Sequence, residues 1–151
     1  MTSAPVREAA TVLIGIDPDH QDGRLLEYGF AYAQRHRLAV KVVTCWRPAL
    51  VARPATAPHE VHVRFSEYVS RWRDAYPDLP VTLSVRTEST HDALVAESAD
   101  ASLLVIGSRS AHPHRPHVFG SVGHAIARDA RCSVAIIPPR PDADPREGCP
   151  S

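Results

Sequence analysis

Glycine and serine residues gather in one stretch of the sequence whose spacing could support phosphate binding. A strongly apolar run ends at Gly107 and is followed by Ser108-Arg109-Ser110. After nine further residues the chain reads Gly120-Ser121-Val122-Gly123. A glycine at a strand end allows a tight turn, and the first turn of a helix presents unpaired N–H groups and a positive dipole end. Those are the components of a phosphate site, but they are also ordinary turn and cap residues. On this pattern alone, both interpretations stay open.

Three histidines, His112, His114 and His117, lie between the two groups of glycines. Imidazole is a good ligand for Zn²⁺, Ni²⁺ and Cu²⁺, so a metal site is one interpretation. No cysteine is close in sequence, and the prolines between the histidines restrict how their rings can converge. We therefore expect no metal; the alternative is that the histidines complement a phosphate more strongly as they gain charge near pH ~6.5.

The sequence lacks the common signatures of catalysis by nucleotide and ester hydrolases. There is no G-x-x-x-x-G-K-[ST] loop, the single lysine is Lys41, and no G-x-S-x-G elbow occurs. We expect a binding or regulatory protein rather than an enzyme. Slow, incidental ATP hydrolysis is the open alternative.

Composition narrows the class of protein further. The 151 residues carry 17 basic and 17 acidic side chains, without the basic excess that attracts nucleic acid or an acidic membrane. No apolar run approaches the ~20 residues of a membrane span, and residues 1–10 contain no apolar stretch of signal-peptide length. Cys45, Cys132 and Cys149 are widely spaced and indicate neither a disulfide framework nor a zinc site. These features predict one cytoplasmic domain without nucleic-acid or membrane partners.

Short apolar runs alternate with segments of helical periodicity. The expected strands are 11–16, 39–46, 80–85, 102–107 and 133–137. The first, fourth and fifth are continuous in Val, Ile and Leu, which is typical of strands covered by helices on both faces. The expected helices are about 21–37, 60–76, 90–99 and 120–131. This order predicts an α/β fold with a doubly wound five-stranded parallel sheet, whose ligands bind near the carboxyl ends of the first and fourth strands.

The second expected helix carries a stripe of apolar and aromatic side chains. They recur at helical spacing: Val61, Phe65, Tyr68, Val69, Trp72 and Tyr76. We interpret this stripe as core packing rather than a ligand site.

Prolines mark the segments expected to lie outside the packed domain. We expect a flexible N-terminus over 1–10, one domain over 11–138 and a Pro-rich disordered tail over 139–151. The stretch 47–59, with three prolines, is expected to be a long loop that serves as a flexible connection or as a lid.

Three segments together resemble the universal stress protein A (UspA) domain family. The first strand ends Ile14-Gly15-Ile16-Asp17, the fourth reads Leu103-Leu104-Val105-Ile106-Gly107-Ser108-Arg109, and the last reads Cys132-Ser133-Val134-Ala135-Ile136-Ile137-Pro138. The resemblance extends from about Thr11 to Pro138. It implies strand order 3-2-1-4-5, an adenine nucleotide alpha hydrolase-like (Rossmann-like) fold, and a homodimer that often forms through the last strand.

The resemblance also implies ATP binding, with or without Mg²⁺, in a stress-response regulator. It nominates the Asp after the first strand, the backbone after the second strand and the glycine loop with its following hydroxyl. These positions are Asp17, Cys45, Gly107, Arg109, Ser110, Gly120, Ser121 and Val122.

The chain departs from the family pattern at Ser110, where the second glycine of the signature is expected. If that position needs a positive φ, serine costs about 1 kcal/mol or more, and its Cβ crowds a phosphate. Two hypotheses follow: an ATP-binding regulator, and an interaction module, again dimeric, that binds no nucleotide but an unknown protein partner.

Overall fold

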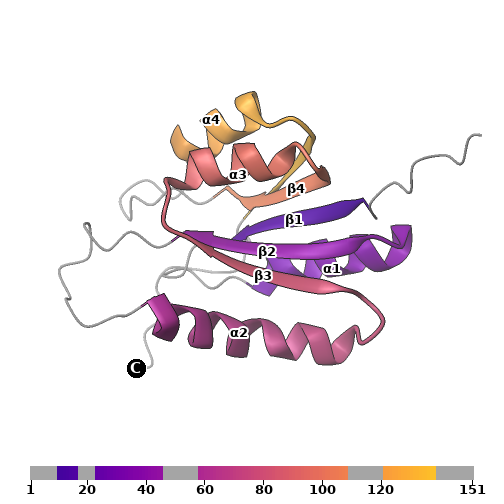
Figure 1. Cartoon of the computed structure of the whole chain (residues 1–151). Coiled ribbons are helices and arrows are strands. Elements are labelled where there is room, and N and C mark those ends of the chain that lie inside the picture. Colours follow the sequence, from indigo (N-terminus) through magenta and orange to yellow (C-terminus); the bar gives the residue numbers. More distant parts are fainter. Residues whose placement is uncertain (1–9, 17–22, 46–57, 109–120, 139–151) are drawn as a thin grey trace, which may run out of the picture.

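Strands and helices alternate along the whole described chain. The structure, a computed structural model, describes residues 10–16, 23–45, 58–108 and 121–138 (Figure 1). The elements are β1 (Thr11–Ile16), α1 (Gly23–His36), β2 (Ala39–Cys45), α2 (Pro58–Ala75), β3 (Val81–Arg86), α3 (Thr90–Ser98), β4 (Ala101–Gly107), α4 (Ser121–Asp129) and β5 (Ser133–Ile137). Every expected strand and helix is present, with ends that shift by at most two residues.

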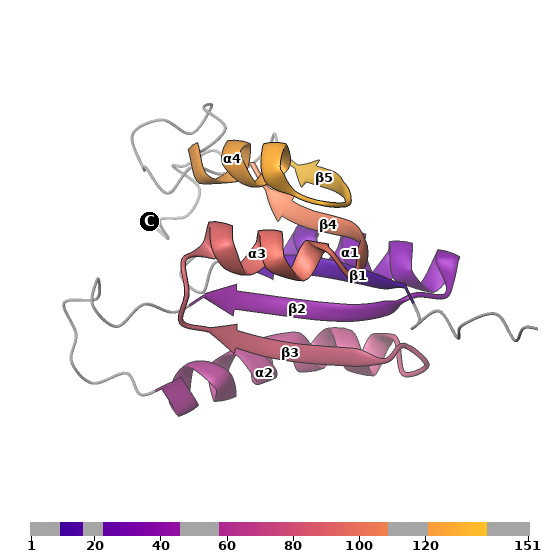
Figure 2. The same cartoon turned by 45° about the horizontal axis from the view of Figure 1, so that its top comes forward.

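The five strands form one parallel sheet in the order β3-β2-β1-β4-β5 (Figure 2). β1 lies at the centre, and its Ile16 pairs with Thr44 of β2 while its Ile14 pairs with Val105 of β4. The fold class and strand order expected from the sequence are confirmed. β3 and β5 are the two edge strands.

The sheet is covered on both faces. α1 and α2 lie on one face and α3 and α4 on the other (Figure 1). Side chains alternate between the faces: Val12 and Ile14 of β1 belong to the cluster under α1 and α2, whereas Leu13 packs with Leu94 of α3. The continuous apolar pattern of β1 follows from this double coverage.

Close packing between α1 and the sheet depends on Gly29. A Cβ at this position would lie 2.8 Å from Cγ1 of Ile14, nearer than side-chain atoms approach one another. In α2, the aromatic stripe is core as expected: Val69 is fully buried, and Trp72 and Tyr76 pack on Phe30 of α1.

One boundary expectation is wrong. The stretch 47–59 was expected to be entirely loop because of its prolines, yet α2 begins at Pro58 and includes His59. Proline fits the first turn of a helix because the N–H that it lacks has no partner there. The rest of that stretch, the N-terminal residues 1–9 and the tail 139–151 lie outside the described residues.

Candidate functional site

The carboxyl ends of β1 and β4 lie side by side at the centre of the sheet. From β1 the chain continues through α1 to β2 on one side, and from β4 through α4 to β5 on the other. The strand order therefore reverses between β1 and β4, and the connections that follow these strands leave toward opposite faces. In open parallel sheets this point is where ligands bind.

The predicted site residues in the described part of the chain all lie at this edge. Cys45 is the last residue of β2 and is half-buried, and Gly107 is the last residue of β4. Ser121 is the first residue of α4, and the adjacent Val122 is 51% exposed. The fold thus brings together three chain segments that are far apart in sequence.

The remaining predicted residues lie outside the described part of the chain, next to these ends. Asp17 directly follows β1, Arg109 and Ser110 follow β4, and Gly120 directly precedes α4. The histidine-containing segment 112–117 also lies outside the described residues. Their placement stays a prediction.

The start of α4 faces the same edge as the strand ends. The backbone N–H of Ser108 donates to the carbonyl of Ile137 at 3.1 Å, which continues the β4–β5 pairing one residue beyond Gly107. Ile126 is buried against the sheet and fixes α4 in place. A helix of nine residues that starts here offers unpaired N–H groups, which suit an anion.

A buried hydroxyl at this edge was not singled out from the sequence. Thr44 of β2 is fully buried, and its Oγ1 has no hydrogen-bond partner among the described residues. It pairs in register with Ile16, the residue before Asp17. An unsatisfied buried hydroxyl costs about 1–3 kcal/mol, so this atom is suited to a partner supplied from beyond the described residues. A Thr next to the end of a largely apolar strand was the available signal.

The charged side chains on the β2–β3 side of the sheet are paired with one another. Glu97 of α3 accepts from Lys41 Nζ at 2.5 Å and from Arg86 Nη1 at 2.9 Å. Arg86 also binds Glu88 at 2.9 Å, and this hydrogen bond is the main reason why the pKa of Arg86 is raised. These cations are already neutralised within the fold, so they are not candidates for binding phosphate.

A second polar cluster joins α3 to α4. His91 Nε2 lies 2.7 Å from Asp129 Oδ2, and His91 Nδ1 lies 3.1 Å from Asp92 Oδ1. Hydrogen bonds to Asp129 and then Asp92 raise the pKa of His91. Hydrogen bonds from Arg128 and then His91 lower the pKa of Asp129 to about 2. The cluster ties the start of α3 to the end of α4, and its role is structural.

Metal and thiol chemistry find no support in the part of the chain that the structure describes. No group of three or more His, Cys, Asp or Glu side chains is arranged there to hold a metal. Neither Cys45 nor Cys132 forms a disulfide with a described residue, and burial raises the pKa of Cys132. No helix among the described residues is long and apolar enough to cross a membrane. The described edge offers backbone groups, a helix N-terminus and one hydroxyl, which together suit ligand binding.

Comparison with known proteins points in one direction. The model of the universal stress protein family matches residues 9–138. A universal stress protein of Mycobacterium bovis is 28% identical over 137 residues, and one of Mycobacterium tuberculosis is 28% identical over 138 residues. Each match covers 87% of this chain and 46% of the relative, so the chain spans about half the length of these curated relatives.

Solved structures support the same fold. A universal stress protein in complex with cAMP superposes with a TM-score of 0.65 at 21% identity, covering 85% of this chain and 96% of the other. A universal stress protein from Archaeoglobus fulgidus in complex with dAMP gives 0.59 at 19% identity, covering 85% and 97%. With the family model matched over nearly the whole described chain, the protein belongs to the universal stress protein family.

Proposed function

We propose that this protein binds an adenine nucleotide, ATP in the first instance, at the carboxyl ends of β1 and β4. The observation that carries the proposal is the reversal of strand order at this point, with α4 starting over the same edge. Two proteins of the same fold are complexes with cAMP and dAMP, which favours an adenine nucleotide over other phosphorylated ligands.

The described residues fit such a ligand. The buried Thr44 hydroxyl lacks a partner among them, and the first turn of α4 offers backbone donors to a phosphate. We assign Asp17 and the backbone at Cys45 to the ribose and adenine. We assign binding of the phosphates, with Mg²⁺ where present, to Gly107, Arg109, Ser110, Gly120, Ser121 and Val122.

We further propose a regulatory rather than a catalytic role, in the cytoplasm, as part of a stress response. Family membership supports this proposal. An unidentified partner protein would then recognise whether the nucleotide is bound. The test is single-turnover incubation with Mg·ATP: product formed on the timescale of seconds would contradict a purely regulatory role.

We also propose a homodimer that forms through β5. This strand pairs with β4 on one side only, and its Ile136 is 41% exposed. Exposed apolar edges tend to pair with another strand. Light scattering of the protein at micromolar concentration tests this proposal, with Ile136→Glu as the disrupting variant and Val63→Glu as the control on α2. A monomeric wild-type protein would contradict it.

Calorimetric titration with Mg·ATP, AMP and cAMP tests nucleotide binding. We expect micromolar binding of at least one of them by nucleotide-free protein. Asp17→Asn should weaken it, whereas Asp78→Asn, an exposed control before β3, should not. Thr44→Val removes the buried hydroxyl at nearly constant shape, with the exposed Thr82→Val as its control on β3.

The same titration decides between the two hypotheses drawn from Ser110. If serine is strained there, Ser110→Gly should strengthen binding about fivefold, which corresponds to about 1 kcal/mol. Absence of heat up to millimolar nucleotide, in both the wild type and Ser110→Gly, would favour the module that binds a protein partner without nucleotide.

A further inference from the structure

A groove runs between α1 and the end of β5, on the face of the sheet away from α3 and α4. Its volume is about 410 Å³. It is lined by Arg24, Glu27, Tyr28, Ala31, Tyr32 and Arg35 of α1, with Ile137 and Pro138. We call it the α1 groove. It does not include any residue assigned to the nucleotide.

The sequence of α1 places these six side chains on one flank of the helix. Counted from Arg24, they fall at i, i+3, i+4, i+7, i+8 and i+11, the spacing of a single helical face. The residues that α1 buries against the sheet are a different set: Leu25, Leu26, Gly29, Phe30 and Ala33. The helix therefore has one face for the core and a second, aromatic flank for another contact.

The floor of the α1 groove is aromatic and partly exposed. Tyr28 and Tyr32 stack with ring centroids 6.4 Å apart at an interplanar angle of 22°, and Tyr28 is 42% exposed. Stacked tyrosines that remain open to solvent form the kind of surface on which Pro-rich segments dock in the polyproline II conformation. Such segments lose little entropy on binding because proline is already restricted.

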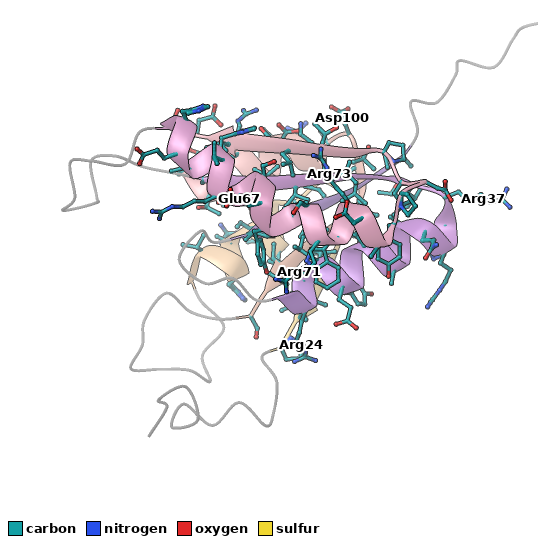
Figure 3. The ribbon with its side chains drawn as sticks, turned by 90° about the horizontal axis from the view of Figure 1, so that it is seen from below. Arg24, Arg37, Glu67, Arg71, Arg73 and Asp100 are labelled. Carbon is teal, nitrogen blue, oxygen red and sulfur yellow. The ribbon has the colours of Figure 1, made fainter. Side chains whose placement is uncertain are left out.

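The α1 groove carries a positive charge at each end. Arg24 lies at the start of α1 and Arg35 near its end; Figure 3 looks onto this layer and shows the positions of Arg24 and of Arg37, just beyond the helix. Arg24 Nη1 already donates to the carbonyl of Pro138 at 2.8 Å. Arg35 forms no salt bridge with any residue that the structure describes. With Glu27 also in the lining, the groove holds two cations and one carboxylate, and Arg35 is the cation that favours an acidic segment.

We propose that residues 139–147 of this chain occupy the α1 groove as a polyproline II segment, with Asp142 and Asp144 at Arg35. The segment reads Pro-Arg-Pro-Asp-Ala-Asp-Pro-Arg-Glu and follows directly on Pro138, which already lines the groove. Its prolines suit the tyrosines of the groove, and its carboxylates suit Arg35, which has no carboxylate partner among the described residues. A segment whose composition favours disorder in isolation can become ordered on such a surface.

The lengths agree with this register. From Arg24 to Arg35 the helix rises over eleven residues, about 16 Å at about 1.5 Å per residue. From Pro138, at Arg24, a polyproline II chain reaches Asp142 after about 12 Å and Asp144 after about 19 Å, at about 3.1 Å per residue. The two carboxylates therefore bracket the arginine.

The tail has an advantage over a second copy of the chain as occupant. Because it is tethered at Pro138, its effective concentration at the groove is in the millimolar range, whereas a second copy binds at its bulk concentration.

Backbone NMR relaxation on the full chain tests the proposal. We expect order parameters of Ala143 and Asp144 near those of the folded core, about 0.85, and well above the ~0.6 that marks flexible chain. Arg35→Glu should release the segment and lower these values below about 0.6. Arg64→Glu, an exposed arginine of α2, is the matched control and should change nothing.

A charge reversal separates recognition from misfolding. Combining Arg35→Glu with Asp142→Arg and Asp144→Arg should restore the order of the segment, because the pair is rebuilt with opposite signs. Flexible values for residues 142–147 in the wild type would overturn the proposal. So would chemical shifts of Tyr28 and Tyr32 that depend on protein concentration both after truncation at Pro138 and in the Ile136→Glu variant, since a second copy would then occupy the groove without pairing through β5.

Discussion

The two helical layers of this protein are held to the sheet by different forces. The α1/α2 layer packs through a large apolar cluster, in which Phe30 lies between Trp72 and Tyr76 with ring centroids 6.2 Å and 5.6 Å away. The α3/α4 layer has a smaller apolar cluster and relies also on polar ties: Glu97 with Lys41 and Arg86, and His91 with Asp129.

This difference matters for the proposed nucleotide site because α4 starts at it. A layer held by apolar burial is not weakened by Debye screening or by proton binding, whereas a layer held partly by ion pairs responds to both. We therefore expect the core layer to set the stability of the fold. The site-bearing layer should respond to solution conditions.

Loss of the central aromatic of the α1/α2 layer should have the largest effect. Phe30 is fully buried, so Phe30→Ala should lower the free energy of unfolding by about 3–5 kcal/mol. Urea denaturation measures this change, and Val63→Ala on the exposed part of α2 is the control. A loss below about 1 kcal/mol would mean that this layer is not held by burial.

Removal of the Glu97 carboxylate from the α3/α4 layer should lower the free energy of unfolding less than Phe30→Ala does. The Glu97 side chain is 16% exposed and its partners about twice as much, so Glu97→Ala should cost about 1–2 kcal/mol, less than for a fully buried pair. The loss should shrink in high salt. If Glu97→Ala lowers the free energy of unfolding by the same amount at every ionic strength, Glu97 stabilises the layer through packing instead of charge.

Relief of backbone strain should stabilise the α1/α2 layer. Arg37 has φ 56° at the end of α1, where Leu38 N–H donates to the Ala33 carbonyl at 2.8 Å in a Schellman-type cap. Arg37→Gly should therefore raise the free energy of unfolding by about 1 kcal/mol. Gln34→Gly, inside the helix, should lower it by about as much, and equal signs in the two thermal melts would contradict this account.

The pH response of the α3/α4 layer should be the smallest effect. Because the pKa of His91 is raised in the fold, its contribution to stability is complete below its unfolded pKa of about 6.5 and is lost as pH rises through the folded value. Asp129, whose pKa is lowered to about 2, contributes above about pH 4 and loses its contribution toward pH 2.

We therefore expect His91→Gln to destabilise most between about pH 4 and 6.5 and least above neutral pH. Denaturation midpoints across this range measure the difference from wild type. His62→Gln, on the exposed part of α2, is the control. A difference that grows as pH rises would reverse the sign of this linkage.

The fold could be predicted from the sequence because its signals are local. The continuous apolar runs of β1 and β4 and the stripe of α2 report burial directly, and the strand order followed from family resemblance. The start of α2 at Pro58 was missed because a proline excludes a helix interior but not its first turn.

Less of the candidate site than of the fold could be predicted from the sequence. The edge with Cys45, Gly107 and Val122 was predicted, but the pairings of Glu97 with Lys41 and of His91 with Asp129 join residues 56 and 38 positions apart. No spacing within one sequence indicates such pairs. The buried Thr44 hydroxyl became visible only once its surroundings were known.

Amide NMR spectra recorded with and without Mg·ATP test the central claim most directly, because they locate the ligand as well as detect it. We expect the largest shifts at Cys45, Ser108, Val122 and Gly123, around the carboxyl edge of the sheet and the start of α4. Unchanged spectra at millimolar Mg·ATP, or shifts confined to the opposite edge of the sheet, would contradict nucleotide binding at this site.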